Sequence, residues 1–283
     1  MTGKTAAASA RTGLAGYFIC FAGIGRREFL RFVNQKERFF SALVRPLVWL
    51  FIFAAGFRNV LGVSMIPPYE TYVLYEVYVT PGLAVMIQLF NGMQSSLSMV
   101  YDREVGSMRV LLTSPFARWS LLLAKVAAGV AVSLVQVYMF LAIARLWDVD
   151  IPWLGYLAAL PALALTGLML GAIGLFLSSL VRQLENFASV MNFVIFPMFF
   201  ASSALYPLWR IRESSEALYV ICLANPFTHA VELVRHALYL SLEPRALAIV
   251  SIVTIVFFIA AALAYDPGRG IMARRGGPAG EAT

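Results

Sequence analysis

Two histidines with a glutamate between them are the best candidates in this sequence for holding a metal ion. His229 and His236 are seven residues apart, so a helix would place them on one face, and Glu232 lies between them. Cys20 and Cys222 are far apart in the chain and show neither a metal-binding spacing nor a disulfide framework. We therefore predict no metal site. We interpret the histidines as interfacial polar residues and the cysteines as small buried residues.

Catalytic motifs are also missing from the sequence. The phosphate-binding pattern GxxxxGK[ST] does not occur, so the chain cannot hydrolyse ATP by that route alone. The apolar segments hold no carboxylates, and the nearest ones only flank them: Glu70, Glu76, Asp102 and Glu185. Ion-coupled carriers usually keep ionisable groups inside the membrane, and hydrolases need paired acids or a serine supported by a histidine. We predict no catalytic residue and disfavour both of these classes.

The composition indicates a polytopic membrane protein. The 283 residues are 60% hydrophobic and 13% charged, whereas soluble domains are about 45–50% apolar and about 25% charged. A spanning helix needs about 20 mostly apolar residues. We predict an all-α fold with six spans: Leu43–Leu61, Tyr78–Val100, Leu121–Ala144, Trp153–Leu180, Asn186–Trp209 and Leu247–Tyr265. Gly167 and Gly171 have the GxxxG spacing that lets another helix approach closely.

The positions of the cations predict the orientation. Most of the 22 basic residues fall in segments that would be cytoplasmic if the N-terminus is cytoplasmic. We therefore place both termini inside, with residues 1–42 as a cytoplasmic N-terminal region, residues 43–265 as the transmembrane domain and residues 266–283 as a cytoplasmic tail. The net charge of +7 then reflects membrane topology, and we predict no nucleic-acid partner.

An amphipathic helix is expected before the first span. The segment Arg26–Phe40 alternates cations with aromatic and aliphatic residues, as a helix in the membrane interface does. Five cations would anchor it to the lipid bilayer: Arg26, Arg27, Arg31, Lys36 and Arg38. Two alternatives remain for this region, namely a signal-peptide core at Leu14–Ile24 and a nucleic-acid-binding patch.

The long loop Arg210–Arg245 contains an apolar stretch that is broken at Asn225-Pro226. Asparagine is a good N-cap and proline a good first helical residue, so we expect two short helices that meet there. Each is too short to cross the membrane, which predicts a re-entrant or surface-lying element on the outer side. Its candidate residues are Asn225, Pro226, His229 and Glu232. In the alternative, this stretch is a seventh span and the C-terminus lies outside.

A polar loop at Tyr101–Ser120 separates the second and third predicted spans. Asp102 can cap a short helix from Arg103 to Leu112, and acidic residues at its start suit the helix dipole. The apolar residues of this helix form one stripe: Val105, Met108, Leu111 and Leu112. Ser114-Pro115 ends the helix. The loop is either a solvated connector or a surface on which another protein acts.

The segment Tyr101–Lys125 resembles the first cytoplasmic loop of the type-2 ABC transporter permeases. In that family, an acidic residue and a glycine precede a short helix, a Thr/Ser-Pro step, an arginine and a lysine. The matching residues here are Glu104, Gly106, Ser114, Pro115, Arg118 and Lys125. Val105 departs from the pattern, because many relatives place the glycine directly after the acid. Residues 20–265 are similar to the family as a whole.

The resemblance implies a membrane subunit of an ABC exporter in the bacterial inner membrane. Two such subunits, identical or related, would form a dimer, and separate ATPase subunits would bind ATP and Mg, with no cofactor in this chain. The short helix would be the coupling helix, which contacts the ATPase through Asp102, Arg103, Glu104, Gly106, Ser107, Arg109, Ser114, Pro115 and Arg118. The expected cargo is amphipathic or lipid-linked. The alternative is a membrane assembly or docking protein without a transport path.

Overall fold

The structure is a computed structural model that describes residues 14–34, 36–57, 68–69, 73–104, 116–147, 149–181 and 183–265. These residues form helices, as the composition predicts, and no strand occurs among them. The helices are α2 (Leu14–Asn34), α3 (Lys36–Phe57), α4 (Tyr75–Glu104), α6 (Arg118–Arg145), α7 (Trp153–Leu180), α8 (Leu184–Phe200), α9 (Leu208–Ser214), α10 (Glu216–Ala224), α11 (Pro226–Leu238) and α12 (Pro244–Ala264). The predicted tail at residues 266–283 lies outside the described residues.

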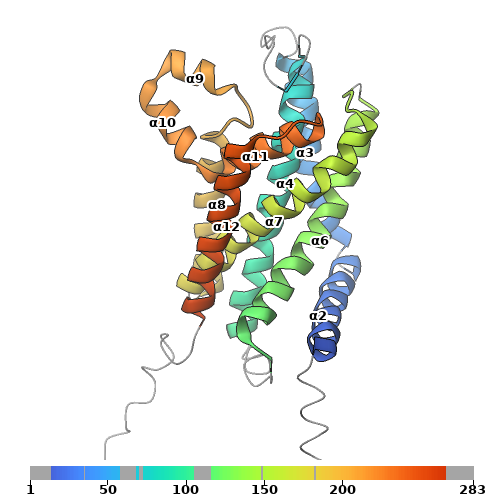
Figure 1. The fold of residues 1–283 in the computed structure, drawn as a ribbon, viewed down its shortest axis with the longest axis vertical. Helices are drawn as coiled ribbons and strands as arrows, with labels where there is room; N and C mark the ends of the chain where they lie inside the picture. Colours follow the sequence, from blue (N-terminus) through green and yellow to red (C-terminus); the bar gives the residue numbers. More distant parts are fainter. Residues whose placement is uncertain are drawn as a thin grey trace, which may run out of the picture.

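The long helices alternate in direction along the bundle (Figure 1). The end of α4, the start of α6, the end of α7 and the start of α8 lie together at the lower end of the view, where α2 is also found. We call this the loop end. The opposite end carries α9, α10 and α11, and we call it the α11 end (Figure 1).

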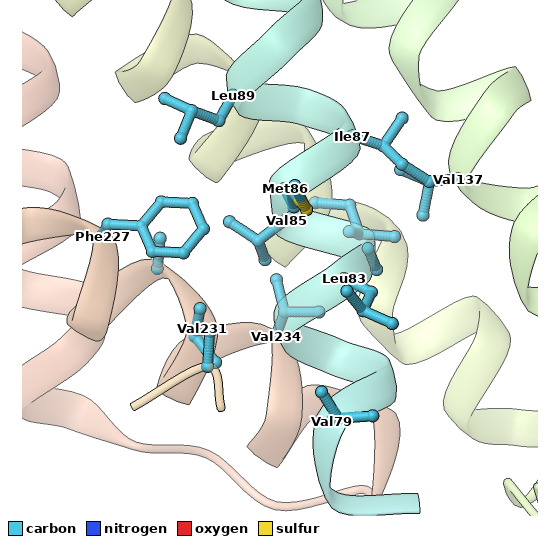
Figure 2. Close-up of a cluster of buried hydrophobic side chains, with 14 of the residues drawn as sticks. Val79, Leu83, Val85, Met86, Ile87, Leu89, Val137, Phe227, Val231 and Val234 are labelled. Carbon is cyan, nitrogen blue, oxygen red and sulfur yellow. The ribbon is translucent and has the colours of Figure 1, made fainter. Parts of the chain in front are cut away.

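Helix α4 is the centre of the bundle and packs against α3, α6, α7, α8 and α11. Every residue from Tyr78 to Phe90 is buried. Figure 2 shows how its aliphatic side chains meet those of two neighbours, with Phe227 and Val231 from α11 on one side and Val137 from α6 on the other. Because α4 is covered from several sides, its position fixes the positions of the helices around it.

Small residues let α7 lie close to both α4 and α6. A methyl group at Gly171 would come within 2.7 Å of a Val126 methyl on α6, and one at Gly167 within 3.1 Å of a Val130 methyl. The close approach predicted from the GxxxG spacing is therefore confirmed, and the partner helix is α6. On the α4 side, a methyl group at Gly92 would come within 3.0 Å of the backbone of α7.

Amide side chains add hydrogen bonds along the same seam. Gln88 of α4 donates to the carbonyl of Leu163 at 2.7 Å and accepts from the Thr166 hydroxyl at 2.6 Å. Asn91 donates to the side chain of Gln136 on α6 at 2.5 Å. These bonds pair polar groups with one another within the bundle, as a low-dielectric interior favours.

Within the described residues, three helices are long and apolar enough to cross a membrane: α6, α7 and α12. The α10–α11 pair would make a fourth span if counted as one, although its two helices are bent by 74°. Helix α8 and Leu43–Ile52 of α3 are shorter apolar segments. The long helix α4 is not among the three, and polar side chains such as Gln88 and Asn91 interrupt its apolar sequence.

The predicted helix Asn186–Trp209 ends earlier than expected. Helix α8 stops at Phe200, and α9 begins only at Leu208. The hydroxyl of Ser202 donates to the carbonyl of Phe199 at 2.6 Å and accepts from the Ala204 amide at 3.2 Å. Serine side chains that bond the local backbone in this way compete with helical hydrogen bonds, so the chain turns here.

The N-terminal amphipathic helix also differs from the predicted Arg26–Phe40. Helix α2 already begins at Leu14 and ends at Asn34, and the next helix begins at Lys36. No proline stands between Leu14 and Arg26, so the helix continues through Gly23 and Gly25. Lys36 and Arg38 therefore belong to α3. Helix α2 packs along α6.

Candidate functional site

The polar loop lies between two described anchor points. Helix α4 continues to Glu104, and the chain is described again from Phe116, two residues before α6 begins. Five of the predicted ATPase contacts lie outside the described residues and stay predictions: Gly106, Ser107, Arg109, Ser114 and Pro115. Arg103 belongs to the last turn of α4. The described side chains that bear on the loop are those of Asp102, Glu104 and Arg118.

Asp102 is buried and forms an ion pair across the start of the loop. Its Oδ2 lies 2.8 Å from the Nζ of Lys125, and the two side chains are only 8% and 5% exposed. The guanidinium of Arg27 on α2 lies 3.9 Å from the same oxygen. A carboxylate near the C-terminus of a helix is unfavourable because that end carries partial negative charge, and the two cations offset this cost.

The prediction that Asp102 caps a short helix is therefore wrong. The residue lies inside the last turn of α4, because no helix-breaking residue stands between Val100 and Glu104. Its carboxylate faces α6 and is covered there, and its predicted contact with the ATPase stays a prediction.

Glu104 connects α4 to the first residue of α8. Its Oε1 accepts a hydrogen bond from the backbone N–H of Leu184 at 2.8 Å. The first N–H groups of a helix have no partner within it, and the N-cap residue of α8, Gln183, supplies no side-chain acceptor. A carboxylate is favourable at this position because the helix N-terminus carries partial positive charge. Glu104 thus replaces a missing cap.

The far side of the loop is held by α2. The ring of Phe116 packs edge-on against Tyr17, with 5.0 Å between the ring centroids. Arg118 is the first residue of α6, and it is exposed together with Trp119. Both ends of the loop therefore contact α2, through Asp102 with Arg27 and through Phe116 with Tyr17.

The predicted membrane anchors divide into two groups. Arg26 and Arg27 have exposed side chains on α2, as an interfacial role requires. The side chains of Arg31, Lys36 and Arg38 lie outside the described residues. The anchor role of all five cations remains a prediction.

At the α11 end, Asn225 occupies the predicted break between two short helices. Its Oδ1 accepts from the Phe227 amide at 3.0 Å, and its Nδ2 donates to the carbonyls of Met198 and Ala201 at 2.7 and 2.6 Å. Pro226 is the first residue of α11. The predicted N-cap is confirmed. In addition, Asn225 ties the break to the end of α8.

The two histidines interact with backbone carbonyls. His229 Nε2 lies 2.9 Å from the carbonyl of Leu223, and His236 Nδ1 lies 2.9 Å from that of Glu232. In the part of the chain that the structure describes, no three His, Cys, Asp or Glu side chains are grouped to hold a metal ion. The side chain of Glu232 instead pairs with Arg235 at 2.5 Å.

Arg235 lies within the predicted loop Arg210–Arg245 and had no role assigned from the sequence. Its side chain is only 2% exposed. Its Nη2 donates to the carbonyl of Ser203 at 2.9 Å, and its guanidinium carbon lies 4.1 Å from the centre of the Tyr78 ring. The sequence did contain one sign of this ion pair, because Arg235 follows Glu232 by three residues on an amphipathic helix.

Tyr69 completes this cluster beside the start of α4. Pro81 has no N–H, so the carbonyl of Val77 lacks its usual helical partner. The hydroxyl of Tyr69 donates to that carbonyl at 3.4 Å. Burial raises the pKa of Tyr69 to about 12, although the nearby Arg235 acts in the opposite direction. The phenol therefore stays protonated and remains a donor at neutral pH.

Several known proteins with similar sequences are named as permeases. The protein of Porphyra purpurea named as transport permease ycf38 is 26% identical over 215 residues, which cover 75% of this chain and 71% of the relative. The Escherichia coli protein named as multidrug ABC transporter permease YbhR is 30% identical over 164 residues, 57% of this chain and 43% of its own. Nodulation protein J of Rhizobium leguminosarum bv. trifolii is 23% identical over 230 residues, 79% and 83% of the two chains.

The family model for the ABC-2 type transporter matches residues 20–239, from α2 to the end of α11. This range includes the loop, both of its anchor points and the buried Arg235. The resemblance of the polar loop to this family is thereby confirmed, and the chain belongs to the ABC-2 type transporter family of membrane transport permeases.

Proposed function

We propose that this chain is the membrane subunit of an ATP-driven exporter and that the loop at residues 105–115 docks a separate ATPase subunit. The supporting observation is that both ends of the loop are fixed to helices. Asp102 pairs with Lys125 before the loop, and Phe116 packs on Tyr17 after it. A force on a loop that is fixed at both ends displaces the attached helices.

We further propose that the loop end faces the cytoplasm and that six helical segments span the membrane. The alternating directions of the long helices bring the end of α4, the start of α6, α2 and the end of α12 to the same end of the bundle (Figure 1). The exposed cations Arg26, Arg27 and Arg118 lie there as well, in agreement with the preference of basic residues for the cytoplasmic side. Both termini are then cytoplasmic.

The α10–α11 pair is proposed to be re-entrant. The 9 residues of α10 and the 13 residues of α11 extend over about 14 and about 20 Å, whereas the hydrocarbon core is about 30 Å thick. Neither helix crosses it alone, and the bend of 74° keeps them from acting as one straight span. The side-chain bonds of Asn225 satisfy backbone groups at the break.

ATP and Mg would bind to the ATPase subunit, and a second copy of this chain or a related permease would complete the transporter in the bacterial inner membrane. An amphipathic or lipid-linked molecule fits the cargo best. One similar protein is named as a multidrug permease, and α8 presents an exposed apolar face that includes Phe193 and Phe196.

We expect an ATPase gene beside the gene for this chain, and co-purification of the two proteins tests the proposal. Arg109→Glu reverses a charge within the loop, so we expect it to weaken ATPase binding and ATP-dependent export together. Arg212→Glu is the matched control, because Arg212 is exposed on α9 at the opposite end. If Arg109→Glu and a deletion of residues 105–113 both left ATPase binding intact, the loop would not be the docking site. A chain that never binds an ATPase would instead be an assembly or docking protein.

A further inference from the structure

The last turn of α4 sends two carboxylates to two different neighbours. Two residues along a helix correspond to a rotation of about 200° around its axis, so their side chains point in nearly opposite directions. Asp102 faces α6 and α2, where it meets Lys125 and Arg27, whereas Glu104 faces the N-terminus of α8 and bonds the N–H of Leu184. The turn that leads directly into the loop is therefore connected to three helices at once.

The two connections differ in strength. Asp102 and Lys125 are both buried, and an ion pair shielded from water is much less weakened by solvent and salt. Glu104 is exposed, and its contact is one hydrogen bond to a backbone N–H. The Asp102 connection holds α4, α6 and α2 together, while the Glu104 connection can be broken and remade at small cost.

Helix α8 is held by similar polar contacts at its other end. Asn225 donates to the carbonyls of Met198, in the last turn of α8, and Ala201, its C-cap. A shift of α8 along its axis would therefore reach the break between α10 and α11. The described contacts form a continuous series from Glu104 through α8 to Asn225.

We propose that Glu104 is a positioning residue that transmits movement of the loop to α8. The inference rests on the proposed function, because the movement would come from an ATPase bound to the loop. In this role Glu104 touches neither the ATPase nor the cargo. It holds the first turn of α8 to the last turn of α4, so that α8 follows when α4 is displaced.

The test uses the full chain with its ATPase subunit in lipid nanodiscs, and MgATP is the added ligand. A cysteine replaces Phe193, which is 79% exposed on α8, in a background with Cys20→Ala and Cys222→Ala, and it carries an environment-sensitive fluorophore. A second reporter at Ile252 of α12, 59% exposed, serves as the control. In the otherwise unchanged chain, MgATP should alter the signal at position 193.

Glu104→Ala should reduce this response by roughly two- to tenfold, the equilibrium shift that the loss of one hydrogen bond provides. Glu104→Gln should retain most of it, because the amide oxygen still accepts the N–H bond. Leu184→Pro removes the other partner of this bond, the backbone N–H that donates to Glu104. Proline is tolerated at the first helical position, and Gln183 already has the extended backbone that precedes a proline. Leu184→Ala keeps the donor and is its matched control.

The variants separate this inference from the proposed function. The expected pattern is a reduced response in Glu104→Ala and Leu184→Pro, no further loss when they are combined, and normal ATPase binding in each. A full response in Glu104→Ala, or an equal loss in Glu104→Gln, would overturn the inference alone. Loss of ATPase binding in Glu104→Ala would also overturn it, because Glu104 would then be a docking contact. An unchanged chain that binds no ATPase would refute the proposed function, and the inference with it.

Discussion

Removal of the Arg235 guanidinium while Glu232 stays in place should strongly destabilise the α11 end. The Arg235 side chain is only 2% exposed, and it pairs with Glu232 at 2.5 Å. It also donates to the carbonyl of Ser203 at 2.9 Å and lies over the Tyr78 ring. Arg235→Met keeps a long side chain and removes the charge, so the variant tests electrostatics more than volume.

The expected cost follows from the burial of the pair. Removing one partner of a buried ion pair costs about 3–5 kcal/mol, and the 21% exposure of Glu232 places the value near the lower limit, about 3 kcal/mol. Arg235→Met with Glu232→Gln removes the remaining carboxylate. The carbonyl of Ser203 still accepts a hydrogen bond from the Tyr78 hydroxyl. The free energy of unfolding of the double variant should therefore fall by only about 1.5 kcal/mol.

Denaturant-induced unfolding of the purified chain in detergent, followed by tryptophan fluorescence, measures all four members of this cycle. We expect an interaction energy of at least about 1 kcal/mol between the two positions. Arg245→Met is the control, because Arg245 is exposed at the start of α12. The reasoning would be refuted if Arg235→Met were as stable as this control, or if the effects of the two single changes simply added.

Three further changes test other contacts. Lys125→Met should destabilise the chain by about 3 kcal/mol, and adding Asp102→Asn should recover most of the loss, because the buried carboxylate is then gone. Gly155→Ala should cost about 1–3 kcal/mol, since a methyl group there would overlap the carbonyl oxygen of Leu238. Asn225→Ala removes an N-cap and the donors to two carbonyls of α8, with an expected loss of about 1–3 kcal/mol. Unfolding in detergent measures each.

Two of these changes have a matched control in the chain. Gly25→Ala controls for Gly155→Ala, because nothing lies within 4 Å of the added methyl group, and it should leave stability unchanged or raise it. Ser215→Ala controls for Asn225→Ala, because Ser215 caps the short helix α10 through one long bond of 3.4 Å. Equal losses in a variant and its control would show that the specific contact is not responsible. For Lys125, failure of Asp102→Asn to restore stability would contradict the ion-pair argument.

Features that depend on local sequence were predictable. The break at Asn225-Pro226 is one example, because both residues act on the turn in which they stand. The close packing at Gly167 and Gly171 is another, since small residues spaced four apart leave a groove whatever the partner helix is. The sequence left open which helix would fill that groove, and the structure places α6 there.

Contacts between distant segments were not predictable from the sequence. Asp102 fits the N-cap rule and also fits the end of a longer helix, and only its contact with Lys125 across the loop decides between the two. Arg235 has the same difficulty, because a cation on an amphipathic helix usually faces water. The partners that keep it buried, Tyr78 and Ser203, come from segments 157 and 32 residues away.

The described charges and amides together indicate which helix can move. Helix α4 is held at both ends by groups that are expensive to separate, with Arg235 over Tyr78 at one end and the Asp102–Lys125 pair at the other. Helix α8 is held at its ends by hydrogen bonds to backbone groups, one from the N–H of Leu184 to Glu104 and two from Asn225 to the carbonyls of Met198 and Ala201. Because such bonds are worth about 1 kcal/mol each, α8 can follow a displacement of α4 through Glu104 and still readjust against it, and a movement of the loop should reach the α11 end by this route.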